Sequence, residues 1–177
     1  MNPGPVPVIS NPRVLNDAVY LASAEQLRGQ VGRKVLLMVT AGDDRGSRYD
    51  TLKAIEATQR ADAVIYGVYH VDSTYHDHCV PSRERIMARS APDRPSDGTL
   101  RRLADETGGH VFHVDKKNTL DDAFKELQDA MRSQYAIGYT PMNPAKDGTF
   151  RHIEIHTRNK DWKVRARKGY YATAAQQ

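Results

Sequence analysis

The chain has 177 residues, of which 39% are hydrophobic, and a formal net charge of +4. This length and apolar content suffice for one domain with a real core, which buries roughly 70% of the unfolded surface when compact. A single cysteine, Cys79, excludes an internal disulfide framework. No segment approaches the roughly 20 apolar residues of a membrane helix, and residues 1–10 lack the features of a secretory signal.

The N-terminal segment, residues 1–10, is an arm in which every second residue from position 3 to position 7 is proline. Proline removes a backbone donor and favours extended chain, so the arm is predicted to be a linker or, at best, an edge strand. Ser10 or Asn11 then caps a predicted helix that has Pro12 at its first position and ends at Gly29 to Gly32.

A β-α-β unit is predicted next. Val35 to Thr40 is a short apolar run typical of a buried parallel strand. Asp50 is placed to cap a helix that ends near Ala61, with Leu52 and Ile55 facing the core. Ala63 to Val71 is a second continuous apolar strand.

Residues 72–98 lack periodicity and are predicted to form a long loop, with a short helix at Ser82 to Arg89. Ser96 or Asp97 caps a predicted helix over Thr99 to Thr107, and the pair Gly108-Gly109 stops it.

His110 to Val114 is the third predicted strand. Thr119 caps the clearest helix, whose apolar residues recur at helical spacing. These residues are Leu120, Phe124, Leu127 and Met131.

After Ser133 the apolar period changes to two, in the segments Tyr135 to Tyr139, Ile153 to Ile155 and Trp162 to Ala166. This alternation predicts an antiparallel meander with one apolar and one basic face. The expected fold is therefore an open, Rossmann-like α/β sheet with helices on both faces, followed by a C-terminal β meander. The expected organisation is an arm (1–10), an α/β part (11–134), a meander of the same domain (135–172) and a tail (173–177).

Five stretches, in this order, resemble the von Willebrand factor A-type domain, and specifically the bacterial, chiefly acidobacterial, family called VWFA-related. They are LNDAVYLA at 15–22, GRKVLLMVT at 32–40, LRRLADETGG at 100–109, RSQYAIGYTP at 132–141 and VRARKGYY at 164–171. The resemblance covers residues 11–172 and implies a protein-interaction module of adhesion or scaffold type. It also implies an extracytoplasmic location, although the chain shows no signal peptide.

Domains of this family hold a divalent cation, commonly Mg²⁺, through an Asp-x-Ser-x-Ser loop, a threonine and an aspartate. Here no Asp-x-Ser-x-Ser sequence occurs upstream, Arg13 stands at the threonine position and Ala41 at the aspartate position. The resemblance therefore implies a degenerate site without a cofactor, in which Mg²⁺ would bind only if Asp43 and Asp44 were rebuilt around it.

The resemblance also places Asn11 after the third strand of such a domain, so the chain corresponds to its C-terminal portion. The strand at Val35 to Thr40 would then be an edge with one apolar side uncovered. We expect the arm segment Val6 to Ile9 to cover part of this edge, or the chain to self-associate through it.

Ligands of open α/β sheets bind beyond the carboxyl ends of the strands, so the loops that follow the first two strands are the predicted binding surface. Its candidate residues are Arg13, Thr40, Asp43, Asp44, Ser47 and Asp72. A cationic Arg13 in the place of the metal ion would attract an acidic protein partner.

Two other functions remain open. One is a metal-dependent hydrolase, because His70, His76, His78 and Cys79 offer three imidazoles and a thiol within ten residues. The other is an anion or nucleic-acid binder that uses the basic residues Lys163, Arg165 and Arg167 with Tyr170 or Tyr171. Its aromatic residues are not interleaved on the basic face, which disfavours nucleic acid. Cys79 is the sole candidate nucleophile, and without an oriented base beside it we expect no enzyme.

Overall fold

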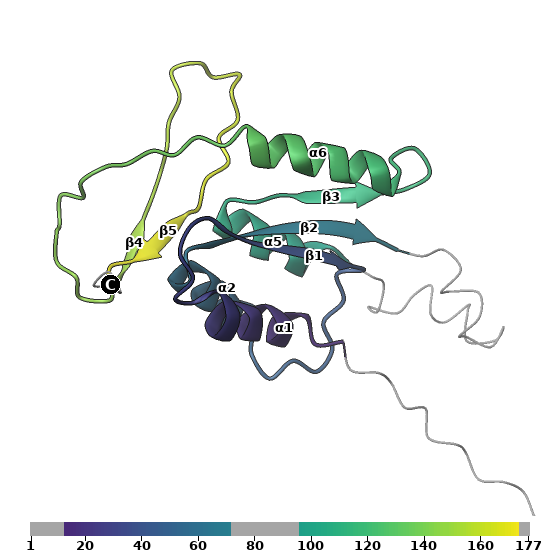
Figure 1. Cartoon of the computed structure of the whole chain (residues 1–177), viewed down its shortest axis with the longest axis horizontal. Helices are drawn as coiled ribbons and strands as arrows, with labels where there is room; N and C mark the ends of the chain where they lie inside the picture. The colour runs from purple at the N-terminus through teal and green to yellow at the C-terminus, as the bar shows by residue number, and fades with distance from the viewer. Residues whose placement is uncertain (1–12, 72–95, 174–177) are drawn as a thin grey trace, which may run out of the picture.

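The computed structural model describes residues 13–71 and 96–173 (Figure 1). Its elements are, in chain order, α1 (Leu15–Leu21), the π-helix η1 (Ala22–Leu27), β1 (Lys34–Thr40), α2 (Thr51–Arg60), β2 (Ala63–His70), α5 (Gly98–Thr107), β3 (Val111–Val114), α6 (Leu120–Arg132), β4 (Phe150–His152) and β5 (Gly169–Tyr171). The described helices include none that is both long and apolar enough to cross a bilayer.

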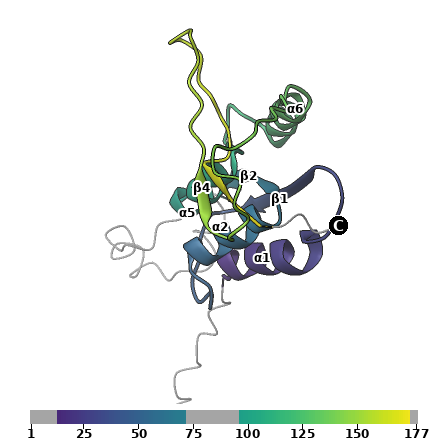
Figure 2. The same cartoon turned by 90° about the vertical axis from the view of Figure 1, so that its left-hand side faces the viewer.

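A parallel sheet with the strand order β1-β2-β3 forms the centre of the fold. Met38 lies opposite Gly67 in the first pair of strands, and Gly67 lies opposite Val111 in the second. Helices α1, α2 and α5 lie on one side of this sheet and α6 on the other (Figures 1 and 2). The predicted α/β class with helices on both faces is confirmed at this level.

The face beneath three helices carries the larger part of the core. Leu15 and Val19 of α1 pack with Ile55 of α2, Ile65 of β2 and Leu103 of α5. The opposite face is covered by α6 alone. Ala123 and Leu127 of this helix pack against Tyr66 and Val68 of β2 and Phe112 of β3, and together they form the second cluster. Over β1 that face stays open, with Leu37 41% and Val39 59% exposed.

Local capping chemistry was predicted correctly for three helix ends. The Asp50 carboxylate accepts a hydrogen bond from the Lys53 N–H at 2.8 Å and starts α2. Thr119 and Asp122 form a reciprocal capping box at the start of α6. Gly108 ends α5 in the left-handed conformation, with φ of 85°.

Three expectations for the helices were wrong. The first helix begins at Leu15 rather than Pro12, with Val14 as its N-cap residue. Leu52 is 60% exposed because the buried stripe of α2 is formed by Ala54, Ile55 and Thr58. On α6 only Leu127 of the four apolar residues at helical spacing is buried, so the expected apolar stripe is not a buried one; the helix rests on two strands and leaves its flanks in solvent.

The predicted β meander is only partly present. Residues 150–152 and 169–171 pair as antiparallel strands, but none of the three segments predicted from the alternation, 135–139, 153–155 and 162–166, forms a strand. Most of residues 153–168 instead extend away from the body of the domain (Figure 2). Trp162 is 68% exposed there. Alternating side chains predict a strand only where backbone hydrogen bonds to a neighbouring strand also form, and in the described residues these segments have no such ladder.

Candidate functional site

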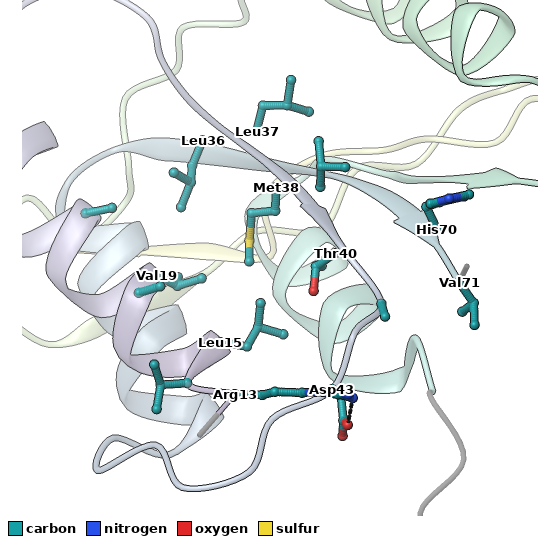
Figure 3. Close-up of a pocket in the computed structure, with 15 residues that line it drawn as sticks. Arg13, Leu15, Val19, Leu36, Leu37, Met38, Thr40, Asp43, His70 and Val71 are labelled. Carbon is teal, nitrogen blue, oxygen red and sulfur yellow. Dashed lines mark hydrogen bonds and ion pairs between the residues drawn. The ribbon is translucent and has the colours of Figure 1, made fainter. Parts of the chain in front are cut away.

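The loop after β1 draws the chain that enters α1 against the carboxyl end of the sheet. The Asp43 carboxylate forms ion pairs with Arg13 and with Arg45, the latter at 3.1 Å (Figure 3). The Arg45 N–H also donates to the Arg13 carbonyl oxygen at 2.6 Å. Residue 13 is therefore held at the carboxyl end of β1 through both its side chain and its backbone.

Asp44 and Ser47 connect the same loop to the first turn of α1. The Asp44 carboxylate accepts from the Asn16 N–H at 2.7 Å and from the Ser47 hydroxyl at 2.8 Å. The Ser47 hydroxyl oxygen in turn accepts from the Asp17 N–H at 3.2 Å. Because the first N–H groups of a helix have no partner within the helix, this loop acts as the cap that α1 lacks in its own sequence.

Five of the six predicted binding residues are thus brought together. Thr40 completes the group, since its hydroxyl oxygen accepts from the Gly42 N–H at 3.1 Å. Asp72 lies outside the described residues. The polar groups of this cluster bond chiefly to one another, so its observed role is to hold α1 against β1.

The donor set of this loop does not fit Mg²⁺. A magnesium ion requires near-octahedral oxygen ligands, whereas Asp43 faces two guanidinium groups and Asp44 is engaged by N–H and O–H donors. Across residues 13–71 and 96–173, no three His, Cys, Asp or Glu side chains are arranged to hold a metal ion. Of the histidine-rich segment only His70 lies within these ranges, at the end of β2, whereas His76, His78 and Cys79 do not.

A groove of about 780 Å³ runs between α1 and the outer edge of β1 (Figure 3). Val14, Leu15 and Ala18 form part of its helical wall, and residues 36–41 of β1 and the following turn form the other wall. Arg13 and Asp43 lie at the end where β1 stops. The groove is therefore apolar along its length and polar at one end.

The backbone groups at this edge can be assigned from the register of the sheet. The Gly67 N–H of β2 donates to the His110 carbonyl next to β3, and Met38 lies opposite Gly67. In a parallel sheet, two residues in register point their backbone N–H and C=O groups in the same direction. The groups of Gly67 point away from β1, so those of Met38 point toward β2. The alternate residues Val35, Leu37 and Val39 then direct theirs toward the outer edge, where β1 has no neighbouring strand among the described elements.

A polar cluster that the sequence did not predict lies at the carboxyl ends of β2 and β3, next to the start of α5. The Asp97 carboxylate accepts from Arg101 and lies 2.7 Å from Nε2 of His113. The Tyr69 ring is 5.3 Å from the imidazole of His113. Ser96 or Asp97 was predicted as the helix cap; the Asp97 side chain makes no capping bond, whereas the Ser96 hydroxyl accepts from the Gly98 N–H at 3.2 Å. The contact of Asp97 with His113 joins residues that are 16 positions apart, and no local sequence pattern predicts such a pair.

Two pKa values in this cluster are shifted. Burial would raise the pKa of Asp97, but the hydrogen bonds from Arg101 and His113 outweigh it and hold that pKa below its usual value. Burial, and then the negative charges of Asp97 and Asp43, raise the pKa of the Tyr69 hydroxyl. Asp97 therefore stays ionised and Tyr69 stays neutral at physiological pH.

Part of the basic C-terminal charge is compensated within the molecule. Arg167 pairs with Asp62, and Lys168 lies 3.3 Å from the Glu106 carboxylate. Lys163 and Arg165 are exposed on the projecting segment. The charge available to an anionic ligand is thus smaller than the sequence alone predicted.

No protein-family model, curated protein or solved structure matches this chain.

Proposed function

We propose that this chain is a non-catalytic protein-interaction module that binds an extended apolar segment of a partner along the outer edge of β1. The observation that carries the proposal is the apolar groove beside an edge strand whose alternate backbone groups are directed outward. Recognition by strand addition uses such an arrangement, in which main-chain hydrogen bonds supply affinity and alternate side chains supply specificity.

The groove favours a partner with small or β-branched side chains on one face of its strand. Ala18 and Val14 are exposed on the α1 wall, and Leu36 and Met38 of β1 face the same space (Figure 3). A strand laid there would bury apolar surface on both sides, at about 25 cal/mol per Å². The resemblance to A-type domains, which are interaction modules, agrees with this function.

An apolar partner is favoured over the acidic one predicted from Arg13. The guanidinium group of Arg13 is paired with Asp43, so the positive charge at that end of the groove is compensated. An acidic residue of a partner would have to compete with this existing ion pair.

The test is binding of a fluorescent peptide that alternates valine and threonine, measured by anisotropy. The Ala18→Glu variant places a carboxylate in the groove and is expected to weaken binding at least roughly tenfold, since burying an unpaired charge is costly. Leu21→Glu is the matched control, because Leu21 is exposed on the same helix but does not line the groove. Equal binding by both variants would contradict the proposal, and so would a peptide that binds neither the parent chain nor a chain that lacks residues 1–9.

A further inference from the structure

We infer that the chain carries its own occupant for this groove: residues 3–9 add to β1 as a parallel edge strand, with Val6 and Val8 beneath α1 and the prolines facing away from the sheet. This inference rests on the groove described under the proposed function. It goes further in naming a competitor, which an external strand would have to displace.

The first argument is where the chain enters the domain. Arg13 is held at the carboxyl end of β1 by its bonds to Asp43 and Arg45, and α1 runs from there back toward Lys34. A segment that precedes Arg13 and lies along β1 must then run parallel to it. Residues 10–14 would connect this strand to α1, which begins at Leu15, and five residues is an ordinary length for such a connection.

The second argument is the hand of the connection. Strand β1 leads to β2 through α2, and β2 leads to β3 through α5, with both helices on one face. Helix α1 lies on that same face. A strand on the outer side of β1 would therefore reach β1 through α1 with the same right-handed crossover, the hand found in nearly all parallel units.

The third argument is the position of the prolines. Pro3, Pro5 and Pro7 are all odd-numbered, and in an extended strand alternate residues direct their backbone groups to the same side. The side with the prolines cannot donate, whereas the even-numbered Val6 and Val8 keep their N–H groups on the other side. Only that second side can both donate to β1 and accept from it, and prolines on the outward side also disfavour addition of a further strand.

The same alternation decides which side chains enter the groove. Gly67 directs its N–H away from β1 toward the next strand, and it belongs to the face that α5 covers, since a Cβ there would lie 2.8 Å from Leu100. In every strand of a parallel sheet, residues whose backbone groups point in this direction have their side chains on this same face. Arm residues that donate toward β1 therefore place their side chains on the helix-covered face. Val6 and Val8 would thus lie beneath α1, beside Leu36 and Met38.

The lengths also agree. Strand β1 has seven residues, and positions 3–9 of the arm are seven residues at the same rise of about 3.3 Å each. The arm can therefore pair with the whole of β1 without displacing any described element.

The test is amide hydrogen exchange at Val35, Leu37 and Val39 in the full chain, without peptide. Val8→Pro removes a donor on the side facing β1 and is expected to accelerate exchange at these amides roughly tenfold, as is deletion of residues 1–9. Ile9→Pro is the matched control, since position 9 faces away from β1, and it should leave exchange unchanged. Equal exchange in the full chain, the deletion and both proline variants would overturn the inference.

Concentration separates the intramolecular arm from the arm of a second copy. Protection that stays constant as the protein is diluted, in a sample that sediments as a monomer, supports the inference. Protection lost on dilution would overturn it in favour of exchange between copies.

Peptide binding reports separately on the proposed function. A peptide that binds more tightly once residues 1–9 are deleted supports both proposals. Protection by the arm without any peptide binding would leave this inference standing and remove the proposed function.

Discussion

The Asp44 carboxylate accepts a hydrogen bond from the backbone N–H of Asn16 at 2.7 Å, across 28 residues of chain. Because the same carboxylate also accepts from the Ser47 hydroxyl, the loop after β1 and the first turn of α1 form one hydrogen-bonded unit. This unit sets the distance between the two walls of the groove, so the proposed binding surface depends on a contact that lies outside it.

Replacement of Asp44 by alanine is expected to destabilise the domain by about 1–2 kcal/mol, the range measured for the loss of a helix-capping side chain. The Asn16 N–H would lose its partner at a partly buried position. Denaturant unfolding measures the change. Asp161→Ala, at an exposed turn, serves as the control, and an equal loss in both variants would argue against the capping role.

The hydroxyl of Thr107 connects the end of α5 to β2. Its oxygen accepts from the buried Ile65 N–H at 3.0 Å, and it donates to the Leu103 carbonyl at 2.9 Å. Thr107→Val keeps the shape but leaves the Ile65 N–H without this acceptor, which should cost about 1–3 kcal/mol. Thr107→Ser retains the hydroxyl and is expected to cost less, so the reverse order in thermal unfolding would contradict this account.

Local chemistry explains why much of the fold could be predicted from sequence. Asp50, Thr119 and Gly108 act on neighbours within three or four residues, and all three perform the predicted roles. Apolar runs identified β1 and β2 because β2 is covered on both faces and β1 packs one face against α1. The prediction that Leu52 faces the core was wrong because helical spacing alone does not tell which of two adjacent apolar stripes faces the sheet.

The candidate site was predictable in position but not in chemistry. The rule that ligands bind at the carboxyl ends of strands identified Arg13, Asp43 and Asp44 as candidates. That these groups bond to one another depends on α1 folding back over about 30 residues of chain. The pair of Asp97 and His113 shows the same limit, since it forms only when α5 and β3 pack together.

Gly109 is required by a close approach of two backbones rather than by its dihedral angles. A Cβ at this position would lie 1.8 Å from the carbonyl oxygen of Ile65. Gly109→Ala must therefore push α5 away from β2, and we expect a loss of roughly 4 kcal/mol or more, at the severe end for single substitutions. Gly138→Ala is the control, because a Cβ there meets nothing within 4 Å. A Gly109 variant as stable as the Gly138 variant would show that the two segments can separate freely.

The ion pairs of Asp97 predict part of the acid sensitivity of this domain. The folded-state pKa of Asp97 lies below its unfolded value of about 3.9, so the stabilisation is complete above that pH and disappears as pH falls through the folded pKa. Asp97→Asn should lower the free energy of unfolding by about 0.5–1 kcal/mol at neutral pH, as expected for a partly exposed pair. The difference from the parent chain should vanish at lower pH.

Urea unfolding between pH 2 and pH 7 measures this convergence of the two stability curves. Some acid dependence should remain in the Asp97→Asn variant, because the hydroxyl and N–H of Thr149 hold the pKa of Asp147 at about 2. Asp105→Asn is the control, since Asp105 is exposed on the same helix. Curves for the Asp97→Asn variant and the parent chain that stay parallel down to pH 2 would show that Asp97 contributes no charge-dependent stability.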